Sequence, residues 1–153
     1  MKINIRLNSE KNTEKLAHII ASEVFPGMII GLSGDLGSGK TTFTKYLAKA
    51  MGINDNLNSP TFTILKTYKG KLNLYHMDVY RLEDIGYDYE LDDYIYGDGV
   101  SVIEWYPYIQ TMLPKEFLSL KFFFINESSR DVYIEGSEEY ETIIQKINHR
   151  YSN

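Results

Sequence analysis

One eight-residue motif constrains the fold of this chain more than any other feature of its sequence. Residues 34–41 match the phosphate-loop pattern G-x4-G-K-[ST]. Glycines at these positions let successive backbone N–H groups converge on phosphates, at the positive end of the helix that follows. In this pattern the lysine reaches the β- and γ-phosphates, and the hydroxyl after it binds Mg²⁺. The sequence therefore predicts a nucleotide site formed by Asp35, Leu36, Gly37, Ser38, Gly39, Lys40, Thr41 and Thr42.

The residues on both sides of the motif have the pattern that a phosphate loop requires. Met28–Leu32 is a short apolar run typical of a buried strand. Residues 42–50 place Phe43, Tyr46 and Leu47 on one face of a helix. A chance glycine-containing turn does not bring this context with it. The strand, the loop and the helix together favour a true nucleotide site.

Apolar patterns along the rest of the chain predict a single α/β domain over residues 1–153. The length and the 43% hydrophobic content suffice for one buried core. We expect a P-loop NTPase-type domain with a mixed, mostly parallel sheet flanked by helices. Residues 61–68 and 71–79 predict a hairpin around Lys69-Gly70. The other predicted strands are 2–7, 100–103, 117–125 and 132–134, and the other predicted helices are 13–24, 82–96 and 137–150.

The composition excludes several classes of site. The chain has no cysteine, so a disulfide framework, a cysteine-ligated metal or a thiol nucleophile is impossible. The N-terminal residues lack the apolar segment of a signal peptide, and no apolar run reaches the length of a membrane span. We therefore expect a cytoplasmic protein without a membrane partner.

The net charge of −5 hides an uneven distribution. Residues 1–71 contain ten Lys/Arg against five Asp/Glu, whereas residues 72–153 contain six against sixteen. Residues 83–98 contain seven acids and no base. Such a segment repels nucleic acid and suits a basic protein partner, although a solvated helical face explains it equally well.

Two acids at predicted strand ends are candidates for the Mg²⁺ chemistry that a phosphate loop needs. Glu104 follows the apolar run 100–103, which has the general form of a Walker B strand, and Asp78 ends the more polar strand before it. His76 shares a strand face with Asp78, and a buried, hydrogen-bonded role is favoured for it over catalysis. No pair of histidines has metal-ligand spacing, so the sequence does not support a zinc site.

Two further features leave two interpretations open. Thr61 and Thr63 follow Pro60 in the region after the phosphate-loop helix. Nucleotide switches place a hydroxyl that senses the γ-phosphate there, but ordinary strand threonines explain the pattern equally well. Trp105 is the only tryptophan and follows Glu104, so its ring stacks either on the nucleotide base or on the core.

Three function classes remain open among phosphate-loop proteins. The chain lacks Asn-Lys-x-Asp and Asp-x-x-Gly, so nothing supports guanine recognition. A small-molecule kinase needs arginines around the transferring phosphoryl group, and this chain has only four, with no arginine-rich lid. The classes are a hydrolysing ATPase, a small-molecule kinase with few arginines and a non-hydrolysing ATP-binding scaffold.

Four segments, in this order along the chain, resemble the TsaE family, the bacterial ATPase subunit of the tRNA threonylcarbamoyladenosine machinery. They are residues 34–42, Ser59-Pro60-Thr61-Phe62-Thr63, His76-Met77-Asp78-Val79-Tyr80-Arg81-Leu82 and Ile103-Glu104-Trp105. The H-x-D-x-Y-R-L and E-W blocks are far more specific than the phosphate loop, and the resemblance covers nearly the whole chain. The chain departs from the family after Trp105, where Tyr106-Pro107-Tyr108 stands in place of Pro followed by an acid or Arg.

The resemblance implies ATP and Mg²⁺ as cofactors and a role for several residues. It places Thr41 and Glu104 at the metal, Asp78 with Lys40 in hydrolysis, Thr61 in a switch-like segment and Trp105 near the adenine. Glu10 and Arg130 match family positions that reach the nucleotide, from the N-terminal segment and from just before the last strand.

The resemblance also implies protein partners. A subunit of this kind joins TsaB and TsaD, of which TsaD transfers the threonylcarbamoyl group to adenosine 37 of tRNAs reading codons that begin with A. ATP hydrolysis then sustains turnover of the pair. The acidic composition agrees with an expectation that tRNA is held mainly by the partners.

Overall fold

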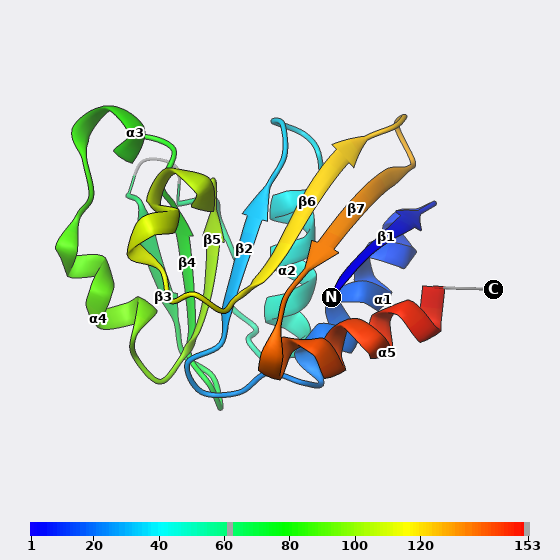
Figure 1. Ribbon diagram of the computed structural model, residues 1–153, viewed down its shortest axis with the longest axis horizontal. Helices are drawn as coiled ribbons and strands as arrows, with labels where there is room; N and C mark the ends of the chain where they lie inside the picture. Colours follow the sequence, from blue (N-terminus) through cyan, green and yellow to red (C-terminus); the bar gives the residue numbers. More distant parts are fainter. Residues whose placement is uncertain (61–62, 152–153) are drawn as a thin grey trace.

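A sheet of seven strands forms the centre of the molecule, and helices pack on both of its faces (Figure 1). The computed structural model describes residues 1–60 and 63–151. The strands are β1 (Lys2–Leu7), β2 (Ile29–Ser33), β3 (Leu65–Tyr68), β4 (Leu74–Asp78), β5 (Val100–Glu104), β6 (Leu118–Phe124) and β7 (Arg130–Glu135). The helices are α1 (Glu10–Ala21), α2 (Lys40–Ala50), α3 (Leu82–Ile85), α4 (Asp92–Ile95) and α5 (Glu141–Tyr151), with 3₁₀ helices η1 (Tyr89–Leu91), η2 (Tyr106–Met112) and η3 (Glu138–Tyr140).

The sheet has the strand order β1-β7-β6-β2-β5-β4-β3. The central strand β2 pairs in parallel with β5 and β6, and β4 pairs in parallel with β5. Only β7 and β3 run against their neighbours, so five of the seven strands share one direction. The predicted mixed, mostly parallel sheet and the predicted β3–β4 hairpin are both confirmed. Parallel pairing brings the carboxyl ends of β2, β4 and β5 to one edge, where open α/β sheets bind ligands.

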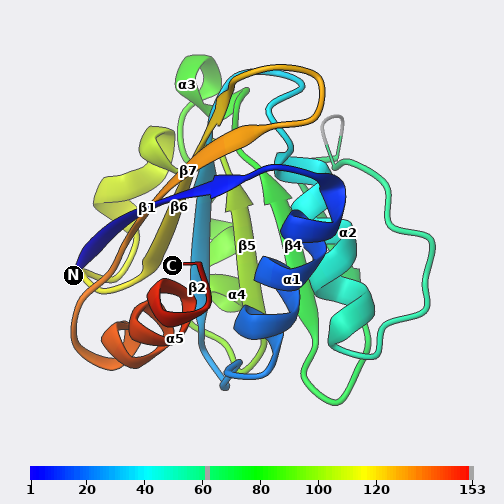
Figure 2. The same cartoon turned by 90° about the vertical axis from the view of Figure 1, so that its right-hand side faces the viewer.

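The two faces of the sheet have separate hydrophobic cores. Helices α1, α2 and α5 cover one face and form the larger core with it (Figure 2). The short helices α3 and α4, together with η1 and η2, cover the other face. Because side chains alternate along a strand, Leu74 of β4 belongs to the larger core and Met77 to the smaller one. His76 and Asp78 therefore lie on the same face as α2.

The acidic segment 82–96, for which the sequence predicts a helix with a mixed pattern, is helical but divided into short pieces. It contains α3, η1 and α4, which are four, three and four residues long. Gly86 ends α3 with a φ of 86°, which a right-handed helix does not allow and which glycine adopts readily. Each piece buries one apolar side chain against the sheet, and these are Leu82, Leu91 and Ile95.

Capping and one tyrosine explain where the outer helices begin. Helix α1 starts three residues earlier than its apolar pattern predicts, because Ser9 Oγ accepts a hydrogen bond of 3.3 Å from Asn12 N. The predicted closing helix is η3 followed by α5. At the end of η3 the buried Tyr140 hydroxyl accepts a hydrogen bond of 3.0 Å from Ile29 N, and burial raises the pKa of Tyr140 to about 12. This bond ties the C-terminal segment to the start of β2.

The described helices are all too short or too polar to cross a bilayer.

Candidate nucleotide site

The predicted phosphate loop connects the carboxyl end of β2 to the first residue of α2. Gly34, Gly37 and Gly39 all have positive φ values, between 79° and 134°. At Gly34 glycine is required for space as well, since a Cβ there would lie 2.5 Å from the carbonyl oxygen of Phe122. The exposed Leu36, with 98% of its side chain accessible, marks the crest of the loop. The loop thus has the backbone form that turns N–H groups toward an anion at a helix start.

Lys40 lies inside this loop. Its ammonium donates a hydrogen bond to the carbonyl oxygen of Gly34 and lies 4.1 Å from the centre of the Trp105 ring. Burial lowers the pKa of Lys40, and the nearby carboxylates of Glu104, Asp78 and Asp35 oppose that shift. A buried cation next to converging N–H groups is the arrangement that binds phosphate oxygens.

The two candidate acids lie side by side at the ends of adjacent strands. Asp78 and Glu104 are register partners in the parallel pair of β4 and β5, and only 7% and 4% of their surfaces are exposed. Glu104 Oε2 lies 2.6 Å from Nε2 of His76, and Asp78 Oδ1 accepts a hydrogen bond of 3.1 Å from Tyr80 N. His76 is thus buried and hydrogen-bonded, as predicted. The chain therefore brings both carboxylates within electrostatic reach of Lys40.

The donor set suits magnesium better than a metal bound by protein side chains alone. No group of three or more His, Cys, Asp or Glu side chains in residues 1–60 and 63–151 could hold an ion. Mg²⁺ in phosphate-transfer sites takes one or two protein oxygens, and the rest of its ligands are phosphate and water oxygens. The Thr41 hydroxyl in the first turn of α2, with Glu104 or Asp78, fits that requirement.

Trp105 belongs to an aromatic cluster at the phosphate end of the site. The residue has a φ of 63°, and its backbone N–H donates a hydrogen bond of 2.9 Å to the carbonyl oxygen of Leu32. The chain therefore turns sharply out of β5. Its ring stacks on Tyr108 at 6.0 Å with an interplanar angle of 8° and meets Tyr80 edge-on at 5.1 Å. The segment in which the chain departs from the family pattern therefore supplies a ring against Trp105. Sequence reasoning missed the contacts of Tyr80 and Tyr108, because stacked aromatic residues have no fixed separation along a sequence.

A hollow of about 310 Å³ lies on the other side of the phosphate loop. Its lining includes Glu10 from the start of α1, Thr42 from α2 and Arg130 from the start of β7. The Tyr46 hydroxyl donates a hydrogen bond of 2.9 Å to Glu10 Oε1, which fixes the position of that carboxylate. Three predicted nucleotide residues that are far apart in the sequence therefore share one hollow.

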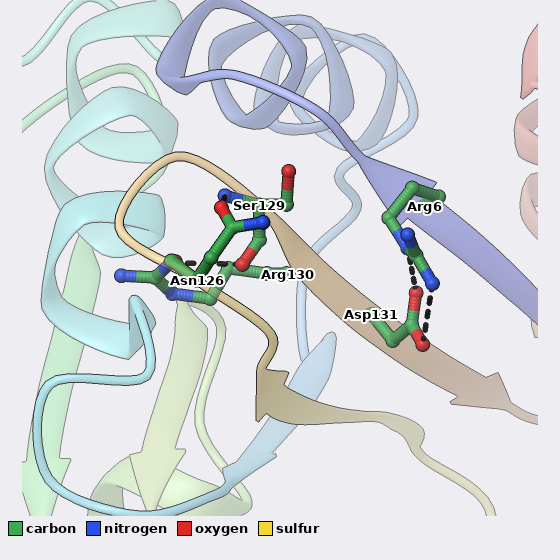
Figure 3. A network of polar contacts seen from close by, with 5 residues as sticks. All are labelled: Arg6, Asn126, Ser129, Arg130 and Asp131. Atoms are coloured by element: carbon green, nitrogen blue, oxygen red, sulfur yellow. Dashed lines mark hydrogen bonds and ion pairs between the residues drawn. The ribbon is translucent and has the colours of Figure 1, made fainter.

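Arg130 holds the phosphate loop from the β6–β7 turn. Its guanidinium donates to the carbonyl oxygens of Ser38 at 2.9 Å and Gly37 at 3.2 Å. The same side chain donates to the carbonyl oxygens of Asn126 and Ser129 within its own turn, as Figure 3 shows beside the separate pair of Arg6 and Asp131. Arg130 thus supports the loop directly, a role that sequence reasoning did not foresee. Thr61, the predicted switch residue, lies outside the described residues.

Comparisons with known proteins show which sequences and structures this chain resembles. A family model described as "Threonylcarbamoyl adenosine biosynthesis protein TsaE" matches residues 7–132. The chain is 41% identical over 150 residues to the "tRNA threonylcarbamoyladenosine biosynthesis protein TsaE" of Bacillus subtilis, with 97% of this chain and 94% of that protein covered. The protein of the same name in Treponema pallidum is 35% identical over 128 residues, with 82% and 95% covered. A crystal structure of Bacillus subtilis YdiB superposes with a TM-score of 0.83 at 33% identity, over 99% of this chain and 97% of that one.

Proposed function

The chain belongs to the TsaE family of tRNA threonylcarbamoyladenosine biosynthesis, and from this premise we propose that it is the Mg²⁺-dependent ATPase subunit of that machinery. One observation supports the proposal most: two buried carboxylates, Asp78 and Glu104, lie in register beside the loop lysine. In this proposal Lys40 binds the β- and γ-phosphates, Thr41 and Glu104 bind Mg²⁺, and Asp78 orients the attacking water. The chain then acts with TsaB and TsaD in the cytoplasm, where tRNA is modified.

The hollow beside Thr42 is the proposed place of the adenine. Its lining carboxylate, Glu10, is held by Tyr46 and is an acceptor for the adenine amino group. Guanine presents a carbonyl oxygen at the equivalent position, which a carboxylate repels. In this proposal Trp105, whose ring lies beside the Lys40 ammonium, is close to the phosphates, whereas the resemblance implies a place near the adenine.

His76 has a positioning role in this proposal. Its Nε2 contacts Glu104 Oε2, and both groups are almost completely buried. A carboxylate held at one oxygen keeps the other directed toward the metal, which is how groups behind metal ligands commonly act. The residue therefore orients a metal ligand without touching the nucleotide itself.

We expect ATP or ADP to change the fluorescence of Trp105 in a saturable manner, and GTP to do so much less. Phosphate oxygens compete for the Lys40 ammonium, which lies over the Trp105 ring, so binding alters the environment of the indole. Because the chain has a single tryptophan, a fluorescence titration reports this site alone. A folded protein that binds ATP by an independent assay but shows no fluorescence response would contradict this placement of Trp105.

The kinase alternative has less support in the structure. Arg6 pairs with Asp131, and Arg130 is bound to carbonyl oxygens of the loop and of its own turn. Two of the four arginines are thus engaged in holding the fold, whereas phosphoryl transfer to an acceptor needs positive charge around the transferring group. A saturable phosphate acceptor with rapid turnover by the isolated chain would favour a kinase over an ATPase.

A further inference from the structure

Helices α1 and α5 enclose a groove of about 680 Å³ that shares no lining residue with the phosphate loop or the hollow beside it. The two helices run antiparallel, since Tyr151 bonds to the carbonyl oxygen of Asn12 while Lys146 pairs with Glu23. Five of the nine lining residues have basic side chains, and none is acidic. They are Lys15, His18, Lys146, His149 and Arg150.

The basic side chains of the groove differ in the local contacts that they make and, among the residues that the structure describes, Lys146 is the one that pairs with an acid, Glu23. Cations in the last turn of α5 interact favourably with its dipole, which accounts for His149 and Arg150. Lys15, in the middle of α1, donates a hydrogen bond of 3.4 Å to the carbonyl oxygen of Arg150 and lies 5.0 Å from the centre of the Tyr151 ring. Within residues 1–60 and 63–151, the side chains of His149 and Arg150 have no ion pair or hydrogen bond. The groove therefore presents basic groups from two elements that are more than 100 residues apart.

The basic groove contrasts with the rest of the molecule. The chain has a net charge of −5, and its acidic segment 83–98 lies at the opposite end of the long axis from α1 and α5 (Figure 1). Basic side chains thus gather in this groove, at the other end of the molecule from the acidic segment. Such a group of basic side chains attracts an anionic partner.

The lining chemistry favours phosphates over a protein segment. Ile19 is the one apolar lining residue, and the other three are uncharged polar side chains. The centres of protein–protein interfaces are apolar and depleted in charge, whereas nucleic acid backbones are bound by Lys, Arg and neutral polar groups. We propose that this groove binds the phosphate backbone of tRNA. The choice of tRNA rests on the role in tRNA modification that the names of the relatives state. The groove itself shares no residue with the nucleotide site.

The test uses the whole chain and a fluorescein-labelled, unmodified tRNA transcript that reads a codon beginning with A. Replacing two cations, Lys15→Gln with Arg150→Gln, is expected to weaken binding about tenfold at ~50 mM salt. The slope of log affinity against log salt concentration should fall by about two. The matched control is Lys69→Gln with Lys71→Gln, which removes the same charge from the exposed β3–β4 turn and should leave the affinity unchanged.

Three outcomes would contradict tRNA binding by this groove. They are no tRNA binding by the wild-type chain at low salt, an equal loss in the control variant, and stronger competition by a polyglutamate peptide than by unlabelled tRNA. Should the first variant unfold, His149→Gln with Arg150→Gln replaces it, because neither side chain has a hydrogen bond or ion pair to lose among the described residues. Each groove variant should keep the Trp105 response to ATP, so a failure of the tRNA proposal is distinguishable from a failure of the nucleotide site.

Discussion

Replacing Lys40 by alanine is expected to reduce Mg-ATP hydrolysis by about 10²-fold or more, the loss typical when one charge-stabilising donor is removed from an active site. The side chain serves phosphate binding in our proposal and contributes little to the core. Its burial lowers the pKa of the ammonium, so the buried charge does not favour folding. The melting temperature should therefore stay close to that of the wild type. Phosphate release and thermal unfolding, measured on the same sample, check both halves of the expectation.

Lys45→Ala provides the matched control for that variant. Lys45 lies on the same helix as Lys40, but its side chain is exposed and outside the loop. The control should hydrolyse ATP at the wild-type rate. A folded Lys40→Ala protein with wild-type hydrolysis would remove the phosphate loop from the mechanism.

Adding TsaB and TsaD together is expected to raise phosphate release by as much as about 10³–10⁵-fold, the factor that an arginine supplied by a partner contributes in other phosphate-loop enzymes. The isolated chain should be slow because few of its arginines can serve the nucleotide. Arg6 is paired with Asp131, Arg130 holds the loop backbone and Arg150 lines the distant groove. Phosphate release with and without the purified pair measures the effect. Equal rates in both samples would contradict coupling of hydrolysis to the complex.

The acidic segment is our proposed docking surface for that pair. The structure shows which acids can be tested without harming the fold: Asp92 accepts a hydrogen bond from Tyr87, whereas Asp84, Glu90 and Asp93 are exposed. Neutralising these three to Asn, Gln and Asn should reduce the stimulation by TsaB and TsaD. Neutralising Asp55, Glu138 and Glu139, which are exposed elsewhere, should not. Equal stimulation of both variants would exclude the segment as a docking surface and leave the coupling intact.

Local patterns predicted the helices and strands whose formation depends on nearby residues. The strand before the phosphate loop, the helix after it and the β3–β4 hairpin depend on apolar periodicity and turn residues within a few positions. The pattern of the acidic segment predicted helix but not its division, in which Gly86, with a positive φ, ends α3 after four residues. Three separate short helical pieces bury the apolar side chains of the segment as well as one helix would.

Contacts between distant residues were beyond sequence reasoning. Arg130 reaches the loop carbonyls of Gly37 and Ser38 across more than 90 residues, and no spacing rule reports such a bond. The stacking of Tyr108 on Trp105 depends on the sharp turn that a positive φ at Trp105 creates. The pairing of Asp78 with Glu104 could be anticipated only as two acids at strand ends, since strand order decides which ends are neighbours.

The most direct test of the central claim is phosphate release from Mg-ATP by the wild-type chain, Asp78→Asn and Glu104→Gln, each with TsaB and TsaD present. Both substitutions keep the size of the side chain and remove its negative charge, and the Trp105 response reports whether nucleotide still binds. If the two carboxylates manage the metal and the attacking water, both variants should bind ATP yet release phosphate about 10²–10⁴-fold more slowly than the wild type. Wild-type rates of phosphate release in both variants would contradict this and leave the pair of acids with a structural role only.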